Sequence, residues 1–229
     1  MAANSDILSA DILIADMLTA AGNFILAHIT VNQTMDFSRY FWQGRLTRLR
    51  PLTAEDAEKG WESMLDSPSR QVLQDGIELP MTLDFRREQM ARRANCQDDG
   101  GLILFAIENL EGEYVGGLSY HSRDRKNGNF SFGVFIAAPH WRKGYAADAT
   151  RILLRYGFLE RRYHKCNSAC VDGNTPSIAL HLALGFREEG RRRDQSYMNG
   201  RYYDELLFGL TFDEFVAGDA PYRPAWLPS

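Results

Sequence analysis

Cysteine is scarce in this sequence, which limits the classes of protein to which it can belong. Only three cysteines occur in 229 residues, Cys96, Cys166 and Cys170, and no CxxC pair is present. An odd number of cysteines is typical of reduced thiols in a cytosol. In one strand Cys166 and Cys170 would share a face with Cα atoms more than about 12 Å apart, too far for a disulfide. We therefore expect both to be small core residues.

An excess of positive charge is also absent. The chain has 26 Lys and Arg residues against 30 Asp and Glu residues, a formal net charge of -4. Domains that bind nucleic acid are usually basic. The run Arg191-Arg192-Arg193 is flanked by acidic residues, so we interpret it as an exposed strand end and expect no nucleic-acid partner.

Several signature motifs are missing as well. The sequence contains no GxxxxGK[ST], no GxGxxG after a strand and no GxSxG, and its five histidines show no metal-ligand spacing. A nucleoside-triphosphate loop, a dinucleotide fold and a serine-hydrolase elbow are therefore disfavoured. We expect no metal.

Long apolar runs without polar interruption are absent too. The most apolar window, residues 12–31, contains Asp16, Asn23 and His28, and membrane spans of about 20 residues rarely tolerate so many polar groups. The N-terminus lacks the basic region of a secretory signal. We expect a cytoplasmic protein with no membrane partner. Residues 1–36 are expected to form one or two helices that cover a partner chain or the main domain.

The apolar content is 45% and the aromatic content 12%, enough for a sizeable core. Apolar periodicity and turn signals from residue 44 onward predict the order β-α-α-β-β-β-α-β-α-β-β, which is an α/β (α+β) fold with a mixed sheet. The expected domains are a helical extension at 1–36, a main domain at 37–216 and an extended Pro-rich tail at 217–229. Strands are expected at 44–52, 101–109, 113–121, 128–138, 164–172, 186–194 and 201–212.

Three helices of this order carry particular expectations. Thr53 is expected to cap the first, because Thr-x-x-Asp at 53–56 places an acid in the first turn. A helix over 145–160 is expected to bury one apolar face and to expose Asp148, Arg151 and Arg155. A short helix is expected to begin at Thr175-Pro176 and to stop at Gly185.

The segment "PHWRKGYAA", residues 139–147, has the features of an anion site. Gly144 gives backbone freedom and a close approach to the main chain. The first N–H groups of the following helix lack internal acceptors and lie at the positive end of its dipole. Arg142 and Lys143 add charge. The segment fits a pyrophosphate-sized anion site, and it also fits an ordinary strand-to-helix connection.

The wider chain carries a resemblance to a known family. The runs "YVGGLSYH", "WRKGYAADATRILLRYGF", "VDGNTPSIALHLALGFREEGR" and "NGRYYDELLFGL" resemble the GNAT superfamily of acyl-coenzyme A-dependent N-acyltransferases. The branch that looks most similar includes ribosomal-protein N-terminal acetyltransferases and spermidine acetyltransferases. The resemblance covers about residues 44–212. It implies a mostly antiparallel central sheet, helices on both faces, and a splayed strand pair formed by 128–136 and 165–171.

The resemblance also implies a site for acetyl-CoA. The family's coenzyme A loop falls on residues 141–146, where Gly144 and Ala146 match and Trp141 departs from the usual Gln or Arg. Backbone N–H groups from Arg142 to Ala147 would hold the pyrophosphate, and the pantetheine arm would lie between the splayed strands. The family's Asn-x-x-Ser/Ala falls on Asn174 and Ser177. The implied cofactor-binding residues are Phe135, Ile136, Trp141, Arg142, Lys143, Gly144, Tyr145, Ala146, Ala147, Asn174 and Ser177.

The groups that move protons are less clear from the sequence. His181 occupies the position at which many family members have a Tyr that protonates the thiolate, and either His181 or Ser177 is a candidate acid. His181 could instead simply pack between Leu180 and Leu184. Relatives often carry a base Glu where this chain has Ser131, which leaves Tyr120 and His121 as candidate bases acting through water.

The resemblance therefore implies an N-acetyltransferase that moves an acetyl group from acetyl-CoA to a primary amine, on a protein N-terminus or a small molecule, by direct attack in a ternary complex. A catalytically weak acyl-CoA-binding sensor or scaffold, and a structural protein that has lost the ligand, are the alternatives. Tyr202, Tyr203, Asp204 and Glu205 could line a pocket for a cationic amine. An edge strand and the apolar N-terminal extension are compatible with a homodimer.

Overall fold

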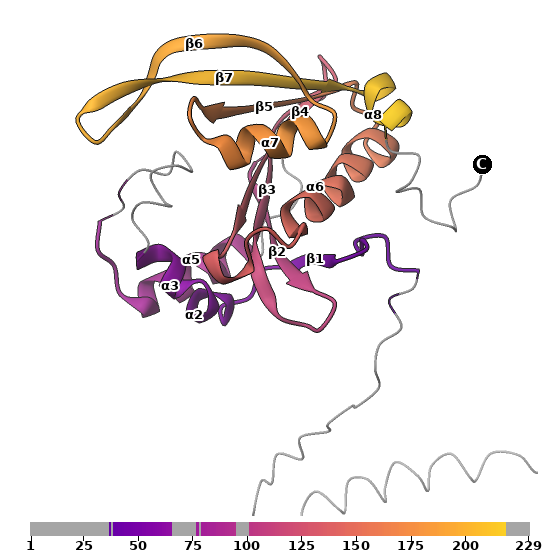
Figure 1. The fold of residues 1–229 in the computed structure, drawn as a ribbon. Coiled ribbons are helices and arrows are strands. Elements are labelled where there is room, and N and C mark those ends of the chain that lie inside the picture. The colour runs from indigo at the N-terminus through magenta and orange to yellow at the C-terminus, as the bar shows by residue number, and fades with distance from the viewer. Residues whose placement is uncertain (1–36, 38, 66–76, 78, 95–100, 219–229) are drawn as a thin grey trace, which may run out of the picture. The chain divides into compact units, whose positions relative to one another are not determined.

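The computed structural model in Figure 1 describes residues 37, 39–65, 77, 79–94 and 101–218. All of these belong to one compact unit, Phe37–Ser229. The helices expected in 1–36, Cys96 and the tail from residue 219 lie outside the described residues.

Seven strands form a single sheet in the order β1-β2-β3-β4-β5-β7-β6. Neighbouring strands are antiparallel except β4 and β5, which are parallel. The prediction of a mixed, mostly antiparallel sheet is therefore confirmed. The strands are β1 (Thr47–Pro51), β2 (Ile103–Asn109), β3 (Tyr114–Asp124), β4 (Asn129–Ile136), β5 (Lys165–Val171), β6 (Arg187–Met198) and β7 (Arg201–Thr211).

The helices follow the expected order in part (Figure 1). The α-helices are α2 (Asp56–Lys59), α3 (Trp61–Leu65), α5 (Leu83–Ala94), α6 (Tyr145–Arg155), α7 (Thr175–Ala183) and α8 (Phe212–Gly218), with a 3₁₀ turn η1 (Ala138–His140) and a π-helical turn η2 (Tyr156–Glu160). Helices α2, α3 and α5 lie between β1 and β2 where two helices were expected, and α8 follows β7. The sequence analysis predicts no helix at the position of α8. The helix expected over 145–160 is thus α-helical only to Arg155 and ends in a wider turn.

Helices cover both faces of the sheet. On β2, Ile107 belongs to the large core cluster that contains Ile152 and Leu153 of α6. Its neighbour Ala106 belongs to a smaller cluster against which Ala94 of α5 packs. Because successive side chains of a strand point to opposite faces, α5 and α6 lie on opposite faces of the sheet.

The parallel pair β4 and β5 separates after a short contact. Its Cα partners are Asn129 with Lys165, Phe130 with Cys166, and Ser131 with Asn167. Beyond these, β4 continues to Ile136 and β5 to Val171 with no further pairing between the two strands. The splayed pair implied by the family resemblance is present, and the strands part after Ser131 and Asn167.

The turn expected at Asn199-Gly200 is present, but the cap expected at the first helix is not. At the β6–β7 hairpin, Asn199 and Gly200 both have positive φ, 50° and 81°, as a type I′ turn requires. The capping prediction at Thr53 was wrong in its direction: the carboxylate of Asp56 accepts a hydrogen bond from the backbone N–H of Thr53 at 2.9 Å. Glu55 precedes α2 with no side-chain cap.

The polar face expected on α6 is also partly wrong. Asp148 and Arg155 are 3% and 5% exposed. The guanidinium of Arg155 donates to the backbone oxygen of Phe41 at 3.1 Å and lies over the Phe41 ring. Burial of this cation is tolerated because it has a hydrogen-bond acceptor and an aromatic face.

Cys166 and Cys170 are free and buried, as expected of core residues. Within the described residues, no helix is long and apolar enough to cross a membrane.

Candidate active site

The loop between β4 and α6 has an unusual backbone. Arg142 and Gly144 have positive φ values of 61° and 84°, and Gly144 directly precedes the first residue of α6. A side chain at 144 would be strained in this conformation, and its Cβ would lie 3.1 Å from Cδ1 of Leu46. Residues 141–144 are exposed. The glycine is therefore required by the course of the chain as well as by access to the main chain.

Six consecutive amides of this loop are free. Within the described part of the chain, no backbone N–H from Arg142 to Ala147 donates to a protein acceptor, and the first that does is Asp148, to the oxygen of Gly144 at 3.1 Å. They include the unpaired donors at the N-terminus of an 11-residue helix. Exposed amides at the positive end of a helix dipole form an anion site. The free amides fit an anion site, and they also occur at the start of an ordinary strand-to-helix connection.

Trp141 anchors this loop although it departs from the family pattern. Its indole Nε1 donates to the backbone oxygen of Ile136, the last residue of β4, at 2.7 Å. Its ring is about half exposed. Trp141 therefore fixes the start of the loop relative to the strand that it follows.

Asp148, which the sequence analysis placed on the exposed face of α6, holds the loop from the other side. Its Oδ1 accepts from the N–H of Arg45 at 3.0 Å, and its Oδ2 accepts from the N–H groups of Leu46 and Thr47, both at 2.9 Å, and from Oγ1 of Thr47 at 2.8 Å. The carboxylate thus joins the first turn of α6 to the start of β1. No pattern of polar residues could have shown this, because the partners are backbone groups about 100 residues away.

The residues expected to line the pantetheine slot lie at the end of β4. Phe135 and Ile136 are both half-buried. As neighbours in a strand they point to opposite faces, so only one of them faces the side of α6. Ile136 packs against the main core cluster together with Val134, which places these two on the α6 face.

Asn174 and Ser177 meet at the start of α7. Oδ1 of Asn174 accepts from the backbone N–H of Ser177 at 3.1 Å, an N-cap interaction. Pro176 lies in the first turn, as expected. Both residues are therefore used at least in part to fix the helix.

His181 is buried in an aromatic cluster. It is 3% exposed and stacks on Phe208 with ring centroids 4.6 Å apart, next to Phe132 and Phe186. Its Nδ1 lies 2.7 Å from the backbone oxygen of Ser177 and its Nε2 2.7 Å from Oγ of Ser168. Burial lowers its pKa below the usual 6.5. Both ring nitrogens therefore have hydrogen-bond partners, and His181 can act on the space between β4 and β5 only through Ser168.

The two candidate bases lie on opposite faces of β3. Tyr120 is fully buried on the α6 face, and burial raises the pKa of its phenol well above the usual range. His121 is half-buried on the other face, directly opposite Ser131, where β4 and β5 part. Burial lowers the pKa of His121 below the usual 6.5, so its imidazole is largely neutral near pH 7. This placement favours His121 over Tyr120 as a group that meets an acceptor.

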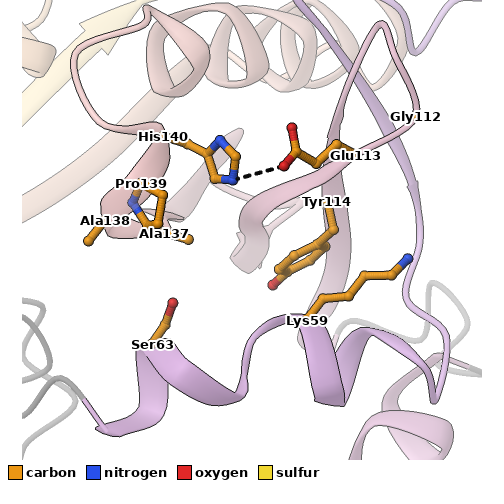
Figure 2. Close-up of a pocket in the computed structure, with 9 residues that line it drawn as sticks. All are labelled: Lys59, Ser63, Gly112, Glu113, Tyr114, Ala137, Ala138, Pro139 and His140. Carbon is orange, nitrogen blue, oxygen red and sulfur yellow. Dashed lines mark ion pairs between the residues drawn. The ribbon is translucent and has the colours of Figure 1, made fainter.

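Two cavities lie beside these elements. The first, of about 660 Å³, is shown in Figure 2 between α2 and α3, the start of β3 and the turn that precedes the loop; Nε2 of His140 there pairs with Oε1 of Glu113 at 3.6 Å. The second, of about 410 Å³, is lined by Tyr202, Tyr203 and Asp204 with three further residues, Asp172, Gly173 and Arg201. Glu205, expected beside them, pairs with Arg192 instead.

The second cavity carries little net negative charge. Arg191 pairs with both Asp172 and Asp204. In the first cavity Lys59 and His140 accompany the single carboxylate of Glu113. Neither cavity contains an excess of carboxylates. Among the described residues no group of His, Cys, Asp or Glu side chains is arranged to hold a metal ion.

The parallel strands β4 and β5 part, and α6, which connects them, begins with free amides. These are the features that the resemblance implies for the acyl-CoA-dependent N-acyltransferases. Comparison with known proteins agrees. The family model described as "Acetyltransferase (GNAT) domain" matches residues 45–187, and the chain belongs to this family of acetyl-CoA-using N-acetyltransferases.

Relatives and solved structures support this assignment. The SPbeta prophage-derived uncharacterized N-acetyltransferase YokL of Bacillus subtilis (strain 168) is 33% identical over 177 residues, 76% of this chain and 95% of YokL. The spermidine N(1)-acetyltransferase of Vibrio cholerae is 27% identical over 100 residues, 44% of this chain and 58% of the relative. A crystal structure of spermidine N-acetyltransferase from Vibrio cholerae in complex with CoA and spermine has a TM-score of 0.65 at 20% identity and covers 74% of this chain and 98% of its own. That structure shows likeness of fold.

Proposed function

We propose that this protein transfers the acetyl group of acetyl-CoA to a primary amine by direct attack in a ternary complex. The observation that carries the proposal is the run of six free amides from Arg142 to Ala147 beside the parted strands. These amides bind the pyrophosphate of acetyl-CoA, and Arg142 and Lys143, both exposed, add positive charge at the rim.

The parted strands supply the rest of the cofactor site. Past Ser131, β4 pairs with β3 on one side only, so its other edge offers free N–H and C=O groups to the amides of the pantetheine arm. Val134 and Ile136 provide the apolar side chains on the α6 face. The thioester then lies where the strands part, next to Ser168 on one face and His121 on the other.

The acceptor that fits best has one amine rather than several. Binding of a polyamine needs several uncompensated carboxylates, because each ammonium loses hydration when it is bound. Arg191 pairs with both carboxylates of the second cavity, and Lys59 lines the first cavity together with its single carboxylate, Glu113. A protein N-terminus or a small monoamine therefore fits the site, although the spermidine acetyltransferase of Vibrio cholerae is named for a polyamine.

The proposal also covers the oligomeric state and the cellular location of the protein. The outer strand β6 carries several exposed charges, including Arg187 and Arg193, which oppose edge-to-edge pairing, so the proposal does not include a homodimer. Two free thiols and use of acetyl-CoA fit a cytoplasmic location.

Thermal unfolding with coenzyme A tests the loop. At a ligand concentration of about 100 times Kd, binding stabilises the native state by about 2.7 kcal/mol, which raises Tm by about 5–10 °C in a domain of this size. Gly144→Glu places a carboxylate where the pyrophosphate binds and removes this increase. Gly200→Glu is the matched control, because Gly200 also has positive φ and a Cβ there meets nothing within 4 Å. An equal increase in both variants would refute the loop assignment.

Turnover tests the reaction. The wild-type protein is assayed for thiol release from acetyl-CoA with spermidine, a small monoamine and a peptide with a free N-terminus. The proposal requires amine-dependent release and an acetylated product. Stabilisation by coenzyme A without any amine-dependent release would indicate the alternative, an acyl-CoA-binding module without catalysis.

A further inference from the structure

Ser168 occupies a distinctive position on β5. It follows Asn167, the last residue of β5 that pairs with β4, and so it is the first residue of the parted segment. Its side chain lies on the α7 face, because its Oγ is 2.7 Å from Nε2 of His181. Ser168 is half-buried whereas His181 is almost fully buried. The Ser168 hydroxyl is therefore the accessible end of a two-residue pair.

The hydrogen bonds define the tautomer of His181. The backbone oxygen of Ser177, 2.7 Å from Nδ1, can only accept, so Nδ1 carries the ring proton. Nε2 then has a lone pair and accepts from the hydroxyl of Ser168. The rings around His181 belong to Phe132 of β4, Phe186 before β6 and Phe208 of β7, and none of them titrates. The resting imidazole is neutral and able to take a proton through Ser168.

We propose, on the basis of the function proposed above, that Ser168 and His181 form a proton relay that carries the amine proton to the departing thiolate. Ser168 is the catalytic residue that contacts the reacting atoms, and His181 acts through it. This route assigns to one pair both proton transfers that the reaction needs.

The step balances as follows. The neutral amine nitrogen attacks the thioester carbon, a C–N bond forms, and the carbonyl electron pair moves onto oxygen. The ammonium so formed gives a proton to Oγ of Ser168, while the Ser168 hydroxyl proton passes to Nε2 of His181. As the oxyanion reforms the carbonyl, the C–S bond breaks and sulfur leaves with the electron pair. Sulfur takes a proton from Ser168, and the imidazolium returns its proton to Ser168. The products are an amide and a thiol.

Two other candidates fit this role less well. The carbonyl oxygen of Ser177, and not its hydroxyl, contacts His181, and it does so at Nδ1. His121, which pairs with Ser131 in the β3–β4 register, lies on the face of the sheet away from α7. It is placed to meet an incoming amine but not to protonate a sulfur on the α7 side.

Steady-state kinetics tests the relay, with acetyl-CoA and whichever amine of the panel the wild type acetylates fastest. Ser168→Ala and His181→Gln are each expected to lower kcat by about 100-fold or more, the usual contribution of acid–base catalysis. The KM for acetyl-CoA stays within about twofold, because pyrophosphate binding is untouched. The double variant is no slower than the slower single variant, since the two residues act as a unit. Ser168→Thr keeps a hydroxyl and restores activity. Ser119→Ala, on β3, is the control and keeps the wild-type kcat.

The pH profile separates a relay from a packing role. In the wild type, kcat rises as pH increases through the pKa of His181, below about 6.5, because the imidazole must be neutral to accept. His181→Gln and Ser168→Ala lose this rise. A wild-type kcat in Ser168→Ala would overturn the relay, and so would losses that multiply in the double variant. In either case, amine-dependent turnover by the wild type would still uphold the proposed function. If the wild type shows no turnover, both proposals fall. If His181→Gln does not fold, the contrast between Ser168→Ala and Ser168→Thr decides.

Discussion

Replacement of Asp148 by Asn is the most direct test of how the fold holds the loop of residues 141–147. The carboxylate is 3% exposed and accepts four hydrogen bonds, three of them from backbone N–H groups of residues 45–47. An Asn oxygen at the position of Oδ2 keeps three of these bonds as neutral ones. The new NH₂ group then faces the N–H of Arg45, so the hydrogen bond at Oδ1 is lost.

The magnitude follows from these contacts. A hydrogen bond to a charged group contributes about 1.5–3 kcal/mol and a neutral one about 0.5–1.5 kcal/mol, so three weakened bonds cost about 3 kcal/mol. Loss of the fourth bond, from the N–H of Arg45 to a charged oxygen, adds about 1.5 kcal/mol. Removal of a buried charge offsets part of this. We expect a net loss of about 3 kcal/mol, or a decrease in Tm of about 6–12 °C.

Calorimetry or circular dichroism measures the change. Asp213→Asn is the matched control, because Asp213 is also in the first turn of a helix but is exposed; its loss of a dipole interaction costs about 0.5 kcal/mol. We also expect a smaller increase in Tm on addition of coenzyme A for Asp148→Asn, since the loop loses its link to β1. A decrease in Tm equal to that of Asp213→Asn would show that the four hydrogen bonds do not hold the loop.

Three further predictions concern stability. Gly157→Ala is expected to cost about 1–3 kcal/mol by overpacking, because its Cβ would lie 2.4–2.9 Å from three atoms of the buried Phe130 ring; Gly190→Ala, with open space, is not expected to lower Tm. Burial acts to raise the pKa of Asp56, but bonds from Arg50 and Thr53 outweigh it and lower the pKa below 3.8. Its contribution to stability is therefore complete above about pH 4 and lost as pH falls through the folded pKa, so urea unfolding should show a weaker dependence on acid pH in Asp56→Asn. Because the pKa of His181 is lowered in the folded state, the unfolded chain binds a proton at a higher pH than the folded chain. The Tm should therefore fall as pH decreases below about 6.5, and it should fall less in His181→Gln. An equal dependence of Tm on pH in the wild type and the variant would contradict the burial of His181 as a neutral ring.

Local signals in the sequence were sufficient for the strands and for the conformation of the loop, whereas the antiparallel arrangement and the splayed pair were implied by the resemblance to the family. Apolar residues and turn signals marked most strands, but β6 is mostly exposed and was located by the Asn199-Gly200 turn that follows it. Gly144 marked the conformation that begins α6, and its φ of 84° is one that other residues rarely adopt. The free amides follow from the geometry of any helix N-terminus, once the side chains around it are small.

The residues that the sequence missed depend on contacts between distant segments. Asp148 looked like an exposed helix residue because periodicity describes polarity and not partners; its partners are amides at the start of β1 and just before it. Ser168 gave no signal, since a serine within a strand has no pattern of its own. Its importance comes from the 2.7 Å contact with His181, and that contact exists only when β5 and α7 are packed together.

The substitution at position 131 becomes understandable in this arrangement. A base on β4 at Ser131 would lie on the face of His121 and not on that of α7, because Ser131 is opposite His121 in the β3–β4 register. An enzyme with a Glu there and a Tyr on α7 divides the two proton transfers between two faces of the sheet. In this chain a single pair on the α7 face can perform both, because a neutral imidazole bonded to a serine can accept a proton and return it. A Glu at 131 would then be unnecessary, and Ser131→Glu should not increase kcat in the wild type but should partly restore it in Ser168→Ala. An equal effect of Ser131→Glu in both backgrounds would show that the two routes are independent and that the relay does not replace the missing carboxylate.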